Sequence, residues 1–229
     1  MILNFLGLGS AFFPELKNTS AYYETEDTLY LFDCGETVFE ELLRRNLINK
    51  KNIKILVTHT HCDHVGSLGS LLSYCYFIQN KKVGEVIHPT DHVKKFLDIV
   101  GIDKVLYNYK TSLNDENISV EPIVVPHVED MVSYGYLITA GEKKAFYSGD
   151  CARVPNAVLE KYLNGEIDEM YLDISSKKSS HAAHGNIFDL EEMVPFEKRK
   201  GVYCMHLDRD YRDIMKEKNF GIIEIEGER

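Results

Sequence analysis

A short stretch rich in metal-binding side chains, residues 53–66, constrains this chain more strongly than any other feature. It begins with an apolar run at residues 53–57, which indicates a buried strand. Three histidines and one aspartate follow within six residues: His59, His61, Asp63 and His64. In an extended segment, residues two apart point to the same side, so His59 and His61 can grip one ion together.

Imidazole nitrogens and carboxylate oxygens are the ligands that zinc and similar divalent ions take in proteins. The alternative is that polar residues have gathered in a surface loop after a strand. A chain with nine histidines seldom produces this spacing by chance. The stretch therefore predicts a metal site at the end of a strand.

Length and composition indicate one globular domain spanning residues 1–229, with 44% hydrophobic residues. No apolar run approaches the ~20 residues of a membrane span. The first residues have neither the charged start nor the cleavage site of a signal peptide and resemble a strand. We therefore expect a cytoplasmic protein that does not contact a membrane.

The five cysteines are odd in number and irregularly spaced, which argues against a disulfide framework and for a reducing compartment. Cys62, Cys151 and Cys204 lie close in sequence to candidate metal ligands. A thiolate ligand is therefore one interpretation, and small buried residues packed beneath a site are the favoured one.

The net charge of −10 lowers the expectation of a large RNA or DNA partner relative to a small nucleotide. The basic clusters are short, at residues 177–178 and 198–200, and a solvated surface is the simplest interpretation of both. A large nucleic-acid partner remains an alternative, because electrostatic fields are local and a net charge does not describe each surface.

The pattern of apolar residues predicts many strands and several helices without an internal repeat or linker. This pattern is typical of a mixed α/β (α+β) fold. Strands are expected at residues 2–6, 21–24, 29–32, 53–57, 83–88, 105–109, 118–125, 131–139, 144–147, 169–174, 201–205 and 220–226. Helices are expected at residues 37–46, 66–79, 90–100, 159–163, 190–195 and 209–218.

Several predicted strands are followed at once by a residue that can bind a metal: His59, His127, Asp150 and His206. A sheet would deliver these residues to one rim, where sites tend to lie. Together with His61, Asp63 and His64, these four residues make a set of seven candidate ligands. One ion needs about four ligands, so seven are enough for two ions that share one carboxylate. Asp33 follows another strand and is placed either to orient a histidine ligand or to form a turn.

The sequence HTHCDHVG at residues 59–66 resembles the signature of the metallo-β-lactamase superfamily. His127, Asp150 and His206 fall in the order of its later motifs, and Asp33 with Gly35 matches its first. The opening segment, FLGLGSA at residues 5–11 with NTS at residues 18–20, is similar to the branch of tRNA 3′-processing endonucleases (tRNase Z) and related phosphodiesterases.

The resemblance implies a four-layer αβ/βα sandwich with two divalent metal ions, zinc first and manganese second. It implies that His59, His61 and His127 hold one ion, that Asp63, His64 and His206 hold the other, and that Asp150 bridges them. His184 is then the first candidate for the general acid that protonates the leaving group, and His181 the second. Relatives in this branch are commonly dimers, so a homodimer is expected by analogy.

Two departures from the tRNA-processing enzymes bear on the substrate. The long glycine-rich arm is missing, since one predicted hairpin fills the stretch from His127 to Asp150, and the His-Ser-Thr motif is reduced to residues 184–186. The chain is more similar to compact phosphodiesterases that open cyclic nucleotides, including phage-encoded ones of the anti-Pycsar type that erase immune signals in the host cytoplasm.

We therefore expect a metal-dependent phosphodiesterase acting on a small cyclic nucleotide, with an arm-less tRNA 3′ endonuclease as the alternative. A thioester or lactone hydrolase is disfavoured by the NTS segment at residues 18–20. A metal-binding protein without activity is disfavoured by the complete ligand set. Neither the base of a cyclic substrate nor the choice of zinc over manganese can be read from the residues.

Overall fold

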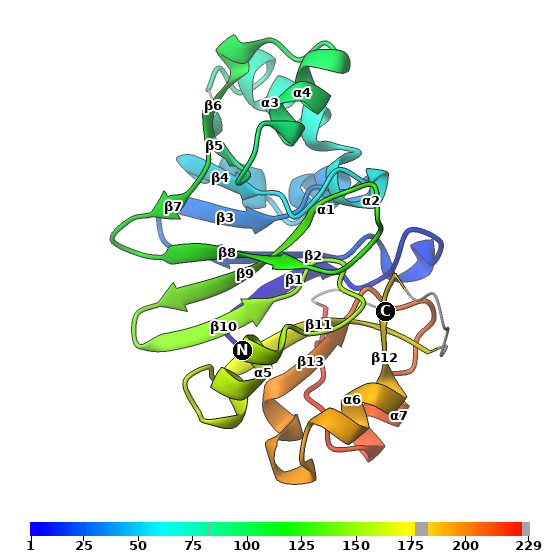
Figure 1. The fold of residues 1–229 in the computed structure, drawn as a ribbon. Helices are drawn as coiled ribbons and strands as arrows, with labels where there is room; N and C mark the ends of the chain where they lie inside the picture. Colours follow the sequence, from blue (N-terminus) through cyan, green and yellow to red (C-terminus); the bar gives the residue numbers. More distant parts are fainter. Residues whose placement is uncertain (82, 177–182, 226–229) are drawn as a thin grey trace.

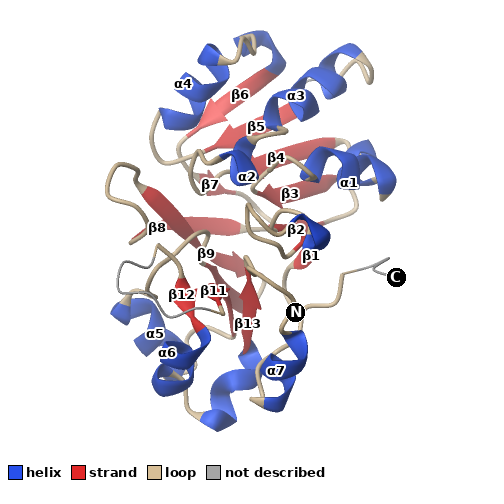
Figure 2. Ribbon diagram, turned by 90° about the vertical axis from the view of Figure 1, so that its right-hand side faces the viewer, coloured by secondary structure: helices blue, strands red, loops and turns tan. Residues whose placement is uncertain are grey.

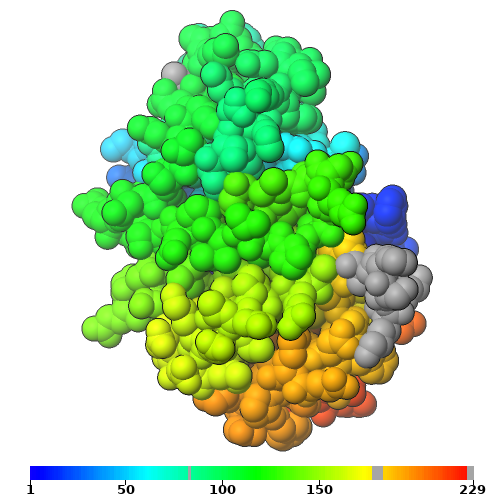
Figure 3. All heavy atoms as spheres, viewed as in Figure 1, coloured from blue at the N-terminus to red at the C-terminus, as the bar shows by residue number. Residues whose placement is uncertain are grey.

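Two β-sheets stack face to face at the centre of the molecule, and helices cover the outer face of each sheet (Figures 1 and 2). The computed structural model describes residues 1–81, 83–176 and 183–225, whose atoms are drawn in colour in the space-filling view of Figure 3. The first sheet contains β1 (Asn4–Gly7), β2 (Ser20–Glu24), β3 (Thr28–Phe32), β4 (Asn52–Leu56), β5 (Val83–Ile87) and β6 (Tyr107–Lys110), in that order.

The second sheet contains β12 (Gly185–Asn186), β11 (Glu169–Ser175), β10 (Lys143–Tyr147), β9 (Ser133–Ala140), β8 (Ser119–Val125) and β7 (Leu113–Asn114), in that order, with β13 (Val202–Met205) paired to β11. Three helices cover the first sheet: α1 (Val38–Arg44), α3 (Leu68–Phe77) and α4 (His92–Ile99). Three cover the second: α5 (Asn156–Leu163), α6 (Ile187–Met193) and α7 (Arg212–Glu217). Shorter elements are α2 (Cys62–Val65), η1 (Pro14–Leu16), η2 (Leu47–Asn49), η3 (Lys104–Leu106) and η4 (Phe196–Gly201).

The central strands are buried on both faces, which is what the four layers require. In β3, Leu29 and Leu31 pack with the helices that cover the first sheet, whereas Tyr30 and Phe32 point into the space between the sheets. Successive side chains of a strand point to opposite faces, so one apolar strand can serve two cores. This confirms the predicted four-layer αβ/βα sandwich.

The strand directions bring several chain segments to one rim. Strands β3, β4 and β5 run parallel, with Phe32 paired to Leu56 and Leu56 paired to Ile87. In the second sheet β10, β11 and β13 also run parallel, with Asp173 paired to Met205. The residues that follow these strands therefore emerge on the same side.

Some elements differ from the sequence-based expectation. The predicted strand at residues 220–226 is wrong for its described part, residues 220–225, where only Gly221 forms an isolated bridge, to Tyr203. Ile223 and Ile225 are buried there, so the alternating pattern reflects burial of one side of an irregular segment. Strand β9 begins at Ser133 rather than at residue 131, and the two-residue strands β7 and β12 carried no recognisable pattern.

Candidate metal centre

The first group of candidate ligands consists of three histidines whose ring nitrogens converge. His59 and His61 follow β4 in extended chain, and His127 follows β8. The Nδ1 atom of His61 lies 3.0 Å from Nε2 of His59 and 3.2 Å from Nε2 of His127. Burial, followed by the neighbouring histidines, lowers the pKa of His59 and His61, which keeps their lone pairs available.

The second group joins the short helix α2 to the end of β13. Asp63 and His64 lie on α2, and His206 follows β13. The Oδ2 atom of Asp63 lies 3.1 Å from Nε2 of His206 and 3.4 Å from Nε2 of His64. Burial opposes a charge on His206, but Asp150 and Asp173 outweigh it and raise the pKa of the His206 imidazole to about 10.

Asp150 lies between the two groups and presents one carboxylate oxygen to each. Its Oδ2 atom is 3.6 Å from Nε2 of both His59 and His127. Its Oδ1 atom is 3.0 Å from Nε2 of His64 and 3.4 Å from Nε2 of His206. The preceding residue, Gly149, has a φ of +56°, and a Cβ there would lie 2.8 Å from Thr58, so only glycine brings Asp150 to this place without strain.

The donor geometry fits divalent cations better than it fits hydrogen bonds. A tetrahedral zinc site with bonds of about 2.0–2.1 Å separates its donors by roughly 3.3 Å, close to the separations within each group. His64 Nε2 and Asp150 Oδ1 are buried and lack a hydrogen-bond partner among the described atoms, although they lie 3.0 Å apart. Two close atoms that do not point at each other are arranged for a third atom between them. The structure thus brings all seven predicted ligands together: His59, His61, His127, Asp150, Asp63, His64 and His206.

Asp33 lies behind the second group and is completely buried with a left-handed backbone, φ 65°. Its Oδ2 atom is 2.9 Å from Nδ1 of His64, and its Oδ1 atom accepts a hydrogen bond from the Thr58 backbone N–H at 2.8 Å. Gly35, two residues later, lies against α2, because a Cβ there would come within 1.9 Å of the Asp63 carbonyl oxygen. The Asp33-x-Gly35 pattern therefore supplies both a partner for His64 and room for the helix.

Asp173 is a central residue of the site that the sequence analysis missed. Its Oδ2 atom is 2.7 Å from Nδ1 of His184 and accepts the Cys151 backbone N–H at 2.9 Å, while its Oδ1 atom is 3.3 Å from Nδ1 of His206. One buried carboxylate therefore contacts two imidazoles. The available signal was a lone charge inside an apolar strand, between Leu172 and Ile174.

His184 lies beside the second group, with its ring stacked 4.9 Å from that of His206. Its side chain is 35% exposed, in contrast to the buried residues of the second group. Burial opposes protonation, but the hydrogen bond with Asp173 raises the pKa of His184 above its ordinary value. The second acid candidate, His181, lies outside the described residues.

The described residues distinguish two interpretations of the cysteines, metal ligation and packing beneath the site. Among them, the groups able to hold a metal contain only histidine and aspartate. The Cys151 thiol donates to the Arg153 carbonyl oxygen, and burial raises the pKa of the Cys204 thiol, while Cys62 is exposed. Packing beneath the site therefore describes Cys151 and Cys204 better than ligation does.

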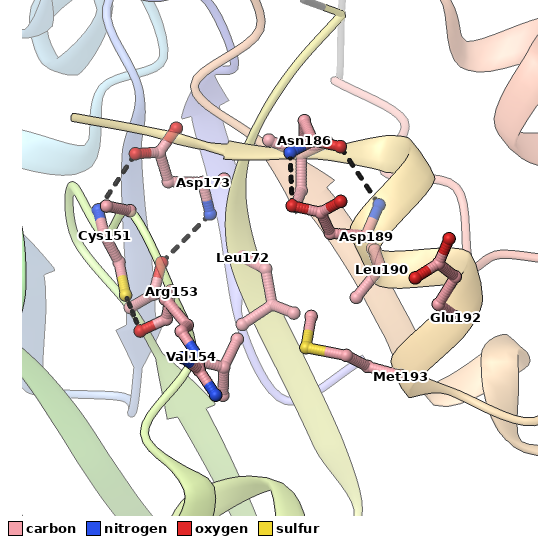
Figure 4. Close-up of a pocket in the computed structure, with 14 residues that line it drawn as sticks. Cys151, Arg153, Val154, Leu172, Asp173, Asn186, Asp189, Leu190, Glu192 and Met193 are labelled. Carbon is pink, nitrogen blue, oxygen red and sulfur yellow. Dashed lines mark hydrogen bonds between the residues drawn. The ribbon is translucent and has the colours of Figure 1, made fainter. Parts of the chain in front are cut away.

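A separate cavity of about 290 Å³ lies beyond Asp173, between the chain after β10 and helix α6 (Figure 4). Leu172 and Met193 point into it in the close-up, and Asn186 caps α6 by accepting the Asp189 backbone N–H. Asp173 belongs to its wall, whereas the histidines of the two ligand groups do not line it. The cavity is therefore adjacent to the metal centre and distinct from it.

Comparison with known proteins identifies the family. Residues 28–202 match the model of a beta-lactamase superfamily domain. The chain belongs to this superfamily. The match spans the first sheet from β3 onward and most of the second sheet, and it confirms the resemblance seen in the motifs.

The similarity of this superfamily member to individual relatives extends over nearly the whole chain. The anti-Pycsar protein Apyc1 of Paenibacillus harenae is 25% identical over 224 residues, covering 90% of this chain and 89% of that protein. Ribonuclease Z of Halalkalibacterium halodurans is 23% identical over 231 residues, covering 88% of this chain and 74% of that protein. The crystal structure of the short form of human tRNase Z superposes with a TM-score of 0.70 at 19% identity, covering 98% of this chain and 97% of that one.

Family membership and the convergent donors together confirm the prediction of a metal-dependent hydrolase that acts on phosphodiester bonds. The superfamily implies divalent metal ions, which agrees with the histidine and aspartate donors described above. No helix within the described residues has both the length and the apolar character needed to cross a membrane.

Proposed function

We propose that this protein is a dinuclear phosphodiesterase that opens a small cyclic nucleotide. The observation that carries the proposal is the position of Asp150, which offers one oxygen to each of two histidine-containing groups. We assign His59, His61 and His127 to one ion, and Asp63, His64 and His206 to the other. Zinc suits this mixed nitrogen and oxygen donor set, and manganese is the second choice.

Two bound ions would supply a nucleophile at neutral pH and neutralise charge on the phosphodiester. The chain itself holds the donors in place and moves the proton that the leaving group needs. Asp173 contacts Nδ1 of His184, which leaves Nε2 as the nitrogen that can face a substrate. We assign to His184 Nε2 the donation of a proton to the leaving sugar oxygen, and Asp33 to the orientation of His64.

Two features support a small substrate: the short hairpin between His127 and Asp150, and the position of the basic cluster at residues 198–200. The segment from His127 to Asp150 contains only the hairpin of β9 and β10. In the basic cluster at residues 198–200, Arg199 is used structurally, since it donates to the carbonyl oxygens of Val194 and Glu191. This cluster precedes β13, whereas His206 directly follows it, and the four residue steps from Val202 to His206 alone span about 13 Å at 3.3 Å per strand residue. The anti-Pycsar relatives support a cyclic nucleotide as the substrate class.

Hydrolysis assays on purified protein test the proposal. We expect metal-dependent opening of at least one cyclic mononucleotide, abolished by a chelator and restored by zinc or manganese. A tRNA precursor is the comparison substrate, because ribonuclease Z is among the relatives. Cleavage of the precursor without any opening of cyclic nucleotides would contradict the proposal and favour the arm-less tRNA endonuclease.

Two further features follow by analogy with relatives. We propose a homodimer, which size-exclusion chromatography with light scattering tests directly. We also propose a cytoplasmic location, that of the host cell if the protein is phage-encoded, since relatives include proteins of Bacillus phages.

A further inference from the structure

Two adjacent residues, Thr19 just before β2 and Ser20 at its start, place hydroxyls behind the second ligand group: that of Thr19 contacts the His206 backbone, and that of Ser20 contacts the backbone of Asp33, the partner of His64. Both are buried, at 2% and 0% exposure. They belong to the NTS segment, for which the reaction itself provides no role. Their hydroxyls point in opposite directions, because the side chains of neighbouring residues in an extended chain point to opposite faces.

Thr19 reaches the second sheet. Its Oγ1 atom accepts a hydrogen bond from the backbone N–H of His206 at 2.9 Å and donates to the carbonyl oxygen of Gly9 at 3.2 Å. The next residue, Leu207, is tied to the same N-terminal segment, since its N–H donates to the carbonyl oxygen of Leu8 at 2.7 Å. The chain that carries His206 is therefore fixed to the first sheet at the ligand itself.

Ser20 reaches in the other direction, within the first sheet. Its hydroxyl is shared between the carbonyl oxygens of Asp33, at 2.9 Å, and Phe32, at 3.1 Å. Asp33 in turn contacts the ring of His64. Ser20 therefore fixes the backbone from which the partner of His64 projects.

The two residues held in this way share an unusual backbone. His206 has a φ of 55° and Asp33 a φ of 65°, both in the left-handed region that non-glycine residues seldom adopt. Such conformations persist where surrounding contacts determine them. The hydroxyls of Thr19 and Ser20 supply contacts of this kind, to the N–H of one residue and the carbonyl oxygen of the other.

We infer that Thr19 and Ser20 form a clamp that pre-positions the second ligand group, acting on His206 directly and on His64 through Asp33. The inference rests on the proposed function, in which His64 and His206 hold the second ion. They are positioning residues, since their hydroxyls contact backbone atoms behind the site. The first group of histidines receives no hydrogen bond from either hydroxyl in the described structure.

Zinc titration of chelator-treated protein by calorimetry tests the clamp. Thr19→Val keeps the shape and removes the hydroxyl, and we expect its second zinc ion to bind at least tenfold more weakly while the first binds within twofold of wild type. Thr19→Ser should restore the second ion. Thr28→Val is the matched control, because Thr28 is also buried in the same hairpin and its hydroxyl contacts Asn52.

Ser20→Ala provides an independent variant, with Ser133→Ala as its control. Ser133 is buried, and its hydroxyl has no hydrogen-bond partner among the described residues. We expect Ser20→Ala to weaken the second ion and Ser133→Ala to leave both ions unchanged. The melting temperature of each metal-free variant shows whether the loss is confined to the site.

The outcomes separate this inference from the function on which it rests. Wild-type binding of both ions by Thr19→Val and Ser20→Ala would overturn the clamp and leave the dinuclear proposal intact. Equal weakening of both ions, matched by Thr28→Val, would also overturn it, since the hydroxyls would then be structural only. A wild-type protein that binds a single zinc ion would instead overturn the dinuclear proposal.

Discussion

The two ligand groups of the metal centre differ in what stands behind them. The first group is backed by neutral partners, since Nδ1 of His59 lies 3.0 Å from the Thr58 hydroxyl and Nδ1 of His127 lies 2.9 Å from the Ala183 carbonyl oxygen. The second group is backed by carboxylates, Asp33 behind His64 and Asp173 behind His206. The second group is also entirely buried, whereas the first includes His61, which is partly exposed.

This difference contrasts two candidate ligands that local sequence brings together with two that the fold brings together. The spacing of His59 and His61 in extended chain is enough to point both rings to the same side. The rings of His64 and His206 come from segments far apart in the sequence, and residues distant from them hold both in place. We therefore expect changes behind the second group to affect one ion, and changes at the shared carboxylate to affect both.

Asp150→Asn should have the largest effect, because it removes the charge that both groups share. We expect turnover to fall by about a thousandfold or more and the affinity for both ions to drop. Turnover and metal content by elemental analysis measure the two effects. Asp130→Asn, an exposed carboxylate in the loop after His127, should change neither.

His184→Ala should come next, since it removes the proposed proton donor without removing an assigned ligand. We expect turnover to fall by about a hundredfold, within the usual range for general acid catalysis, while metal content stays full. His92→Ala, an exposed histidine on α4, is the control. Unchanged turnover in His184→Ala would assign proton donation elsewhere.

Asp33→Asn addresses the contrast between the groups directly. We expect the second ion to bind about 10–100-fold more weakly, because the carboxylate behind a histidine ligand raises its basicity and fixes its ring. The first ion should bind within twofold of wild type in a zinc titration. Asp115→Asn, which loses a carboxylate paired with Lys54 away from the metal centre, should bind both ions normally. Equal loss of both ions in Asp33→Asn would mean that the two groups are not independent.

Glu41→Gln should have the smallest effect on the site and a clear effect on stability. Burial opposes the charge of Glu41, but Arg44 and Lys17 outweigh it and lower its pKa from 4.5 to about 2. A lowered pKa in the folded state stabilises the protein above pH 4.5, and this stabilisation is lost as the pH falls towards 2.

Urea unfolding of metal-free protein measures the effect of Glu41→Gln. We expect the free energy of unfolding to fall by about 2 kcal/mol near pH 7. The unfolding free energies of variant and wild type should converge as the pH approaches 2. Zinc binding at pH 7 should be unchanged. A difference in stability that stays constant from pH 7 to pH 3 would contradict the assigned ionisation.

The fold and the seven candidate ligands could be predicted because each left a local mark in the sequence. The apolar run before His59 defines a strand, and His127, Asp150 and His206 each follow a strand that ends in apolar residues. Asp173 left no such mark, because its neighbours Leu172 and Ile174 continue the strand and its partners lie 11 and 33 residues away in the chain. Partnership across the sheet depends on the parallel pairing of β11 with β13, which no local pattern encodes.

The roles of Thr19 and Ser20 were hidden for the same reason. Their hydroxyls bind backbone atoms of His206 and Asp33, and backbone atoms have no signature in a sequence. The left-handed conformations of His206 and Asp33 were equally hidden, since neither is glycine. Local pattern therefore identifies candidate ligands, and tertiary structure identifies the residues that hold them in place.

Anomalous diffraction from crystals of the zinc-loaded protein tests the central claim most directly. We expect two zinc peaks about 3.5–4 Å apart, one beside each histidine group, with the Asp150 carboxylate between them. A single peak, or two peaks that Asp150 does not join, would contradict the dinuclear centre.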